Sequence, residues 1–434
     1  MNFEIIKKYF INFSWNMIGQ FTKIFFGAFV TVYLINYLGP KDFGLLSFAL
    51  SIVGILYPIA TLGLDAIVFR NLISDQSKEK IIIKTAYLVR LISGSILLCV
   101  VVLFSFFFTN NKVLFFLLTI LSIGMVLEAF SIYKEYFSSI VKHKYIALSS
   151  IIANIFSNII KLLFIFTKFS VVWFSITFLI EKFLNVLFLK YFYNKKNQNK
   201  SIGFYNPKLA KEMIQDSWPL MFTSFAGILY MYSDQIIIKF YLGDEKVGLY
   251  AAAAKLVMFF YAIPAVLSNI MYPDVIKLNK NLKTWAFIKK LENIYFFNFI
   301  IALIFLILIL IFGNLIIDVL LEDAFAQSVD VLYIYAFGLI FIFFAANNNK
   351  LLMIENLQKI MLIRNLIGLI FNIFLNFILI PQYGIKGAAF STLISQFLIM
   401  LSYGLNPKTK YIFFLQIKVF IFPILIIKNK IFKS

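Results

Sequence analysis

The sequence has very little of what enzymes and redox proteins use for chemistry. Its 434 residues include one cysteine, Cys99, and one histidine, His143, so no internal disulfide or cysteine–histidine metal site is available. The chain also lacks the G-x-x-x-x-G-K-[ST] loop that binds ATP phosphates. We therefore expect no cofactor, no metal ion and no catalytic residue.

Charge is scarce as well. Only 14% of the residues are charged and 62% are hydrophobic, whereas soluble domains have about 25% charged residues and are about half apolar. No soluble fold can bury so much apolar surface, and the excess is spread along the whole chain. The composition therefore predicts a protein that crosses the lipid bilayer many times.

Acidic residues are half as common as basic ones, 20 against 40, which gives a net charge of +20. In a soluble protein this excess would favour nucleic-acid binding, because basic side chains neutralise phosphates. In a membrane protein, lysine and arginine gather in cytoplasmic loops and contact anionic headgroups. We expect the lipid bilayer, and not nucleic acid, to be the partner of these charges.

Twelve stretches are apolar enough to span a bilayer as helices, at about 20 residues each. They lie at residues 10–36, 42–65, 82–107, 113–137, 145–166, 170–192, 214–239, 248–271, 288–311, 329–350, 361–380 and 386–404. Residues 411–427 form one more apolar stretch, which Lys418 and Pro423 interrupt. We favour an interfacial helix for this tail, with a thirteenth span as the alternative.

Basic residues fall in alternate gaps between these spans. One set of gaps, together with Lys7 and Lys8 before the first span and Lys408 and Lys410 after the last, holds 25 lysines and arginines. The other set holds six, which are Lys41, Lys112, Lys168, Lys239, Lys246 and Lys386. Because cytoplasmic loops collect positive charge, we expect both termini to be cytoplasmic.

An internal repeat relates the two halves of the chain. Residues 37–47, YLGPKDFGLLS, resemble residues 241–251, YLGDEKVGLYA. Gly39 of the first copy corresponds to Gly243 of the second. Each copy joins the first and second span of its half, so an even number of spans separates the copies and the halves share one orientation. A substrate cavity near the membrane midplane is typical of such symmetry.

The expected fold is therefore an all-α membrane protein with about 12 transmembrane helices in two six-helix lobes, related by parallel pseudo-two-fold symmetry. We predict an N-terminal lobe at 1–193, a cytoplasmic linker at 194–213, a C-terminal lobe at 214–405 and an interfacial or cytoplasmic tail at 406–434.

Three stretches resemble one known family. They are residues 13–71, with Tyr-Leu-Gly-Pro at 37–40 and Thr-Leu-Gly-Leu-Asp at 61–65; residues 217–253, with Ser-Trp-Pro-Leu at 217–220 and Val-Gly-Leu-Tyr at 247–250; and residues 381–389, PQYGIKGAA. With these motifs the chain resembles the O-antigen and capsule oligosaccharide flippases, over nearly its whole length.

The resemblance implies the two-lobe fold of multidrug exporters and of the lipid II flippase, in the bacterial inner membrane. It also implies the substrate, an undecaprenyl-diphosphate-linked oligosaccharide that alternating access moves from the cytoplasmic to the periplasmic leaflet. The chain would then be a secondary transporter and not an enzyme, with an H⁺ or Na⁺ gradient or the membrane potential as its energy source.

Charged residues inside spans are functional candidates, because burying a charge in the bilayer costs at least about 2.5–3.5 kcal/mol. Lys23 lies roughly 20 Å along the first helix from its cytoplasmic start, too deep to set topology. Lys255 lies a third of the way into the eighth helix, and the resemblance favours a basic residue at both places. We predict that both ammonium groups face the substrate diphosphate in a cationic cavity; the alternative is that each extends along its helix toward the headgroups.

Lys161 is a weaker candidate for the same cavity. Asn154 and Asn158 precede it at helical spacing, so the three would form a polar face that binds sugar hydroxyls. A hydrogen-bonded seam between helices explains the asparagines as well.

Glu128 and Glu181 are the acids nearest the membrane middle, and proton uptake by either is a possible coupling step. Local ion pairing, of Glu128 with Lys134 and of Glu181 with Lys182, is the alternative. The resemblance leads us to look for an acid just after Lys255, but Val257 and Met258 stand there, so the coupling ion stays open.

Asp65 and Arg70 bracket the inner end of the second span and match the resemblance, as does Asp234 near the outer end of the seventh. For Asp65 and Arg70 we expect structural or gating contacts, as for the turn glycines Gly39 and Gly243. Asp234 either lines the outer mouth of the cavity or satisfies nearby backbone.

Two other functions are open to the sequence. A small-molecule exporter of the same fold is one, although a drug-cation exporter would have acidic residues in its cavity. A membrane glycosyltransferase or polymerase acting on the same lipid is the other. Such enzymes need acids or bases in large outer loops, and here the longest outer loop, around 313–330, has acids but no Arg or His.

Overall fold

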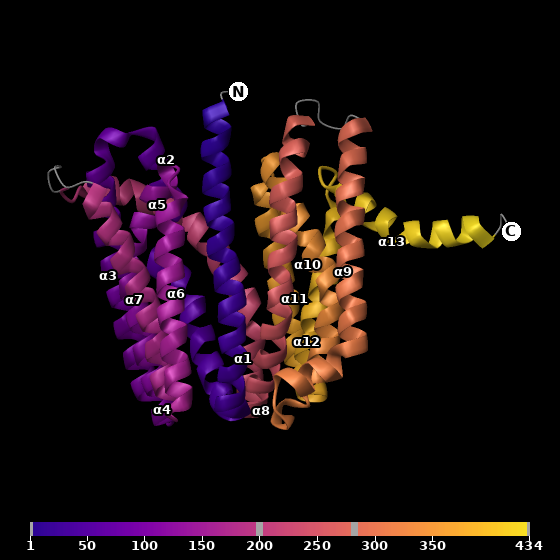
Figure 1. Ribbon diagram of the computed structural model, residues 1–434, viewed down its shortest axis with the longest axis horizontal. Coiled ribbons are helices and arrows are strands. Elements are labelled where there is room, and N and C mark those ends of the chain that lie inside the picture. Colours follow the sequence, from indigo (N-terminus) through magenta and orange to yellow (C-terminus); the bar gives the residue numbers. More distant parts are fainter. Residues whose placement is uncertain (1–2, 197–202, 279–284, 432–434) are drawn as a thin grey trace. The chain divides into compact units, whose positions relative to one another are not determined.

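The computed structural model describes residues 3–196, 203–278 and 285–431, without most side chains of 3–25, several of 262–277 and those of 421–431. Every regular element in these ranges is helical (Figure 1). The elements are α1(Phe3–Thr61), α2(Leu64–Ser74), η1(Gln76–Lys78), α3(Glu79–Phe108), α4(Lys112–Leu127), η2(Glu128–Ser131), α5(Ile132–Ser139), α6(His143–Phe166), α7(Val171–Lys196), α8(Pro207–Leu278), α9(Trp285–Leu320), η4(Asp323–Phe325), α10(Ser328–Ile354), α11(Gln358–Tyr383), α12(Ile385–Ser402), η5(Tyr403–Leu405) and α13(Lys410–Ile431).

Ten helices within the described ranges are long and apolar enough to cross a membrane. Two of them, Phe26–Ser74 with 49 residues and Pro207–Ser268 with 62, are far longer than the roughly 20 residues that one crossing takes. Each is broken at a glycine, Gly39 or Gly243, and is long enough to count as two crossings. Counted in this way, the described ranges give the expected twelve, and the predicted all-α fold class is confirmed.

The repeated Tyr-Leu-Gly turn has the same backbone conformation in both halves. Gly39 has φ 65° and ψ 174°, and Gly243 has φ 82° and ψ −174°. Only glycine adopts this region readily, so α1 and α8 both kink where the repeat predicts a connection between spans. Within each half, four further membrane-crossing helices follow the kinked one.

The chain forms two compact units, unit 1 (Met1–Tyr232) and unit 2 (Ser233–Ser434), which we describe separately. In unit 1 an apolar core joins α1, α3, α4 and α7 around Leu46, Leu117 and Phe174. The boundary between the units lies inside α8, whose first half packs with unit 1. The lobe and linker limits expected from the sequence stay a prediction.

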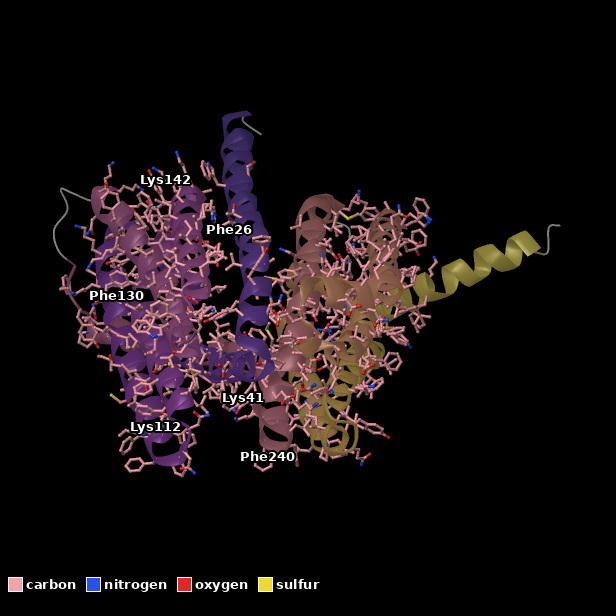
Figure 2. The ribbon with its side chains drawn as sticks, turned by 60° about the horizontal axis from the view of Figure 1, so that its bottom comes forward. Phe26, Lys41, Lys112, Phe130, Lys142 and Phe240 are labelled. Atoms are coloured by element: carbon pink, nitrogen blue, oxygen red, sulfur yellow. The ribbon has the colours of Figure 1, made fainter. Side chains whose placement is uncertain are left out.

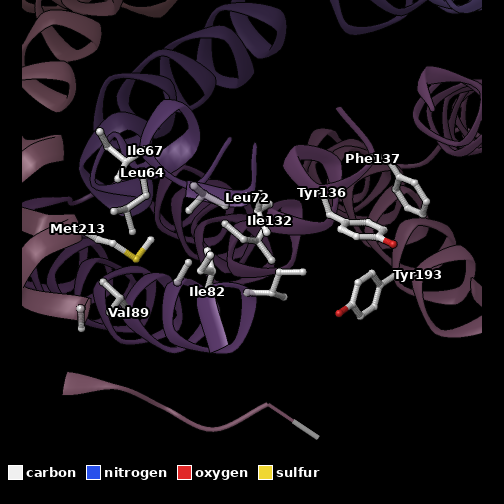
Figure 3. Packing of buried hydrophobic residues seen from close by; sticks show 14 of the residues in the cluster. Leu64, Ile67, Leu72, Ile82, Val89, Ile132, Tyr136, Phe137, Tyr193 and Met213 are labelled. Carbon is white, nitrogen blue, oxygen red and sulfur yellow. The ribbon is translucent and has the colours of Figure 1, made fainter. Parts of the chain in front are cut away.

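A second core closes one end of unit 1 (Figure 3). It brings Leu64 and Leu72 of α2 against Ile132 and Tyr136 of α5 and Met213 of α8. The chain turns into α2 at Gly63, where a Cβ atom would lie 2.5 Å from the backbone nitrogen of Met221. Gly63 thus lets α2 and the first half of α8 approach closely.

Lysines mark the two ends of unit 1. Lys142 lies at one end, and Lys41 and Lys112 lie at the other (Figure 2). This separation is the one expected from the alternation of basic gaps, in which Lys142 belongs to the lysine-rich side.

Helix α13 runs across the direction of α9 and α12 and not along it (Figure 1). Its first turns dock on unit 2 through buried Ile412 and Leu415, and Tyr411 donates a hydrogen bond to Glu355. Burial, and then this hydrogen bond, raises the pKa of the Tyr411 phenol well above its usual range. The interfacial helix that we favour for the tail stays a prediction, and this orientation is compatible with it.

Candidate functional site

Unit 1 pairs its buried charges. Arg90 is fully buried in α3, and its guanidinium donates to Asp65 Oδ1 at 2.6 Å and to Ser131 Oγ at 3.0 Å. Asp65, expected to have a structural role, thus links α2 to α3. The sequence did not single out Arg90 as its partner, because 25 residues separate the two.

The fourth span breaks where Glu128 meets its partner. Residues Glu128–Ser131 form a 3₁₀ turn between α4 and α5, and short 3₁₀ stretches inside helices often mark functional or strained places. Glu128 Oε2 lies 3.0 Å from Lys182 Nζ, which also lies 4.3 Å from the centre of the Tyr57 ring. Gly124 leaves room for this lysine, since a Cβ there would lie 3.3 Å from Lys182 Cδ.

The polar face predicted on the fifth span is present and buried. Lys161 donates to Asn158 at 3.3 Å, and Asn158 donates to Asn154 at 3.1 Å. The two outer residues of this hydrogen-bonded row both contact the Glu181 carboxylate of α7. Asn154 Nδ2 lies 3.4 Å from Oε1, and Lys161 Nζ lies 3.7 Å from Oε2. The face therefore joins α6 to α7, and the charge of Lys161 is neutralised inside unit 1.

Arg70 forms a different contact, with Asp216 in the first half of α8. The guanidinium and carboxylate are 2.5 Å apart, and both side chains are about half exposed, at 56% and 48%. This pair ties α2 to α8 beside the close approach at Gly63.

Unit 2 holds a buried carboxylate with neutral partners only. Asp234 of α8 accepts hydrogen bonds from Asn376 at 2.5 Å, from Thr392 at 2.6 Å and from Tyr250. Asn372 donates to Thr392 at 3.2 Å and accepts from Ser233 at 2.8 Å. The carboxylate is 3% exposed and forms no ion pair within the described part of the chain.

The sequence reasoning missed the partners of Asp234. Asn372 and Asn376 have the same i, i+4 spacing in an apolar span as Asn154 and Asn158, so the pattern that found one pair would have found the other. Nothing local connects this pair to Asp234, which lies more than 130 residues away. Asn376 Oδ1 is buried and accepts no hydrogen bond from the residues the structure describes.

Lys255 is half-buried on α8 and forms no hydrogen bond or ion pair with the described residues. Arg364 of α11 is only 5% exposed. Its Nε donates to Ser402 at 3.1 Å and its guanidinium stacks on the Tyr403 ring, but no described acid faces it. Lys23 lies in α1, with its side chain outside the described ones.

The two units therefore treat charge differently. Among the described residues, the buried charged side chains of unit 1 all form ion pairs: Arg90, Glu128, Glu135 and Lys161. In the described part of unit 2, the buried Asp234 and Arg364 form none; of its half-buried lysines, Lys239 pairs with Asp244 and Lys255 forms no ion pair. Since an uncompensated charge in the bilayer is costly and is retained for function, unit 2 carries the stronger candidate for a charged-ligand site.

This architecture, with kinked first helices and polar residues inside the spans, is that of a multi-pass membrane protein. It matches solved structures over almost the whole chain. The lipid II flippase MurJ in an inward closed conformation has a TM-score of 0.73 at 19% identity, covering 96% of this chain and 93% of that one. An inward-facing multidrug transporter of the MATE family, in the MOP superfamily, has a TM-score of 0.66 at 13% identity, covering 90% and 94%.

The chain belongs to the polysaccharide biosynthesis protein family, whose model matches residues 10–273. It is 26% identical, over 214 residues, to the capsular polysaccharide biosynthesis protein CapF of Staphylococcus aureus. That match takes in 49% of this chain and 53% of CapF, so the chain spans about half the length of this relative. The family expected from the sequence motifs is confirmed.

Proposed function

We propose that this protein is a flippase that moves an undecaprenyl-diphosphate-linked oligosaccharide from the cytoplasmic to the outer leaflet of the bacterial inner membrane, for capsule or O-antigen synthesis. The family and the fold support a flippase or exporter. The observation that carries the finer proposal is Lys255, a half-buried membrane cation whose charge no described residue neutralises. A diphosphate is the ligand that such a cation suits.

Lys23 is the proposed second contact to the diphosphate, and alternating access exposes the cation-lined site first to the cytoplasm and then to the outside. We do not assign Lys161 to the diphosphate, because the Glu181 carboxylate already neutralises its charge. A small-molecule exporter remains the second candidate, supported by the MATE-like fold. The unpaired lysine favours an anionic substrate over a drug cation.

For the coupling ion, H⁺ or Na⁺, Asp234 is now the better candidate. Glu128 and Glu181 each have a lysine within 4 Å, so bound H⁺ or Na⁺ would compete with a resident cation. Asp234 has only hydroxyl and amide partners, and the unsatisfied oxygen of Asn376 lies beside it. Oxygen ligands of this kind suit a proton or a hard cation.

Deletion of the gene tests the assignment in cells. We expect surface polysaccharide to be lost and the complete lipid-linked oligosaccharide to accumulate, because assembly continues on the cytoplasmic leaflet without export. Labelling of intact cells with a membrane-impermeant reagent specific for the glycan would detect little of the accumulated lipid. If the deletion strain instead accumulates incomplete oligosaccharide, the protein acts in synthesis and the membrane glycosyltransferase reading is correct.

A further inference from the structure

Unit 1 contains a cavity of about 470 Å³ between α1, α4, η2, α6 and α7. Its volume is within the range of about 300–1,000 Å³ that small-molecule sites occupy. Helices α4, α6 and α7 lie side by side there (Figure 1). The cavity borders the 3₁₀ break at Glu128–Ser131, so the interruption of the fourth span faces an open volume.

The lining of the cavity is both apolar and polar. Leu50 and Val53 of α1, with Leu121 of α4, contribute apolar surface. Ser131 and Asn185 contribute hydroxyl and amide groups. A lining that offers both apolar surface and hydrogen-bonding groups fits a ligand that carries C–H surface and hydroxyls on one ring.

Each charged group that lines the cavity has a counter-charge. Glu128 pairs with Lys182 at 3.0 Å, Glu181 pairs with Lys161 at 3.7 Å, and Lys134 lies 3.7 Å from Glu135. The carboxylate oxygens can still accept hydrogen bonds, and the ammonium groups can still donate them. A diphosphate, with two or more negative charges, would find no uncompensated cation here, whereas a neutral polar ligand needs none and can exchange its hydrogen bonds to water for bonds to these groups.

We propose that this cavity binds a pyranose ring of the cargo oligosaccharide. The inference rests on the proposed function and extends it, because it separates glycan recognition in unit 1 from diphosphate recognition at Lys255. The sugar next to the diphosphate would bring its negative charges beside groups that are already paired. The cavity therefore takes a residue further out along the glycan.

Cavity-filling variants provide the test. Val53→Trp and Leu179→Trp enlarge lining side chains on two different helices without touching an ion pair. Leu187→Trp is the matched control, because Leu187 lies on the same helix as Leu179, is 43% exposed and does not line the cavity. Two variants on different helices are used so that the test still works if one of them fails to fold.

The first measurement uses the free oligosaccharide released from the cell's own lipid-linked precursor. Saturation-transfer NMR on the protein in nanodiscs should show transfer to distal sugar protons for the unaltered protein and for Leu187→Trp, and its loss in both filling variants. Equal transfer in all four proteins, or none in any, overturns the inference whether or not the protein is a flippase.

The second measurement is flipping in vesicles of two lipids, one with the full oligosaccharide and one with a single sugar on the same diphosphate. Both filling variants should slow the full lipid by about tenfold, as expected for one or two lost hydrogen bonds, and leave the single-sugar lipid unchanged. Equal slowing of both lipids, or of neither, contradicts a distal sugar site. If the unaltered protein binds the free glycan but flips neither lipid, the proposed function fails and the sugar site stands.

Discussion

Individual charged residues differ in what they cost the fold. Arg90 is fully buried and pairs with Asp65, whose side chain is 53% exposed, whereas Arg70 and Asp216 are both about half exposed. Removing the partner of a buried charge leaves that charge uncompensated, while a pair with both partners exposed contributes little. The two arginines of the second and third spans thus offer an internal comparison.

Asp65→Asn should therefore destabilise the protein by about 3 kcal/mol, because it leaves the buried Arg90 guanidinium without a counter-charge. Asp216→Asn should cost less than about 1 kcal/mol. Thermal unfolding of the purified protein in detergent measures the difference. Equal losses in the two variants would mean that the Arg90 pair does not stabilise unit 1.

Lys255 should matter for export and not for folding. We expect Lys255→Ala and Lys23→Ala each to reduce surface-polysaccharide export by about 30-fold or more, since losing one partner of a desolvated charge pair costs about 2–5 kcal/mol. Membrane levels should stay normal. Lys211→Ala is the control, because Lys211 is an exposed lysine on the same helix α8.

Normal export by both variants would remove the cationic cavity from the account. Export that falls only together with the amount of protein in the membrane would show that the lysines serve folding instead.

The sequence predicted the polar groups of the site better than their partners. The face of Asn154, Asn158 and Lys161 follows from helical spacing alone. The pairing of Glu128 with Lys182, and of Asp234 with Asn376, depends on how distant helices pack. Short-range reasoning therefore offered Lys134 for Glu128 and no partner for Asp234.

At the scale of elements, the glycine turns are the best-defined feature of both halves. Their positions could be predicted because a whole segment recurs in the second half, which is stronger evidence than a single glycine. The 3₁₀ break at Glu128–Ser131 could not be predicted from the sequence, because its four residues include no glycine or proline that would interrupt a helix. Its cause is tertiary: Ser131 accepts from Arg90 and Glu128 meets Lys182.

Gly39→Ala and Gly243→Ala should each destabilise the protein by about 1–3 kcal/mol, the cost of a non-glycine residue in this backbone region. No atom lies within 4 Å of a Cβ at either position, so the whole effect is backbone strain. Gly27→Ala in α1 and Gly227→Ala in α8 are matched controls, also without contacts but in regular helix. They should stabilise by about 0.5–1 kcal/mol.

Thermal unfolding distinguishes these outcomes. If Gly39→Ala were as harmless as Gly27→Ala, the turn would be free to adopt another conformation, and the shared geometry of the two repeats would carry no structural requirement.

At the scale of the whole molecule, hydropathy and the repeat were enough for the twelve crossings, because the bilayer restricts a spanning chain to few solutions. The limits of each compact unit were harder to predict from the sequence. The first half of α8 packs with unit 1 through Gly63 and Arg70, although its sequence begins the second repeat. Local patterns cannot show which neighbour a helix packs against.

Flipping by the purified protein is the most direct test of the central claim that the chain translocates a lipid-linked glycan. Vesicles containing only this protein and a fluorescent undecaprenyl-diphosphate oligosaccharide are treated with a membrane-impermeant quencher. We predict that label of the inner leaflet becomes quenchable at a rate that Lys255→Ala sharply lowers and that an imposed H⁺ or Na⁺ gradient raises. Quenching that stops at the outer leaflet, as in protein-free vesicles, would contradict the account.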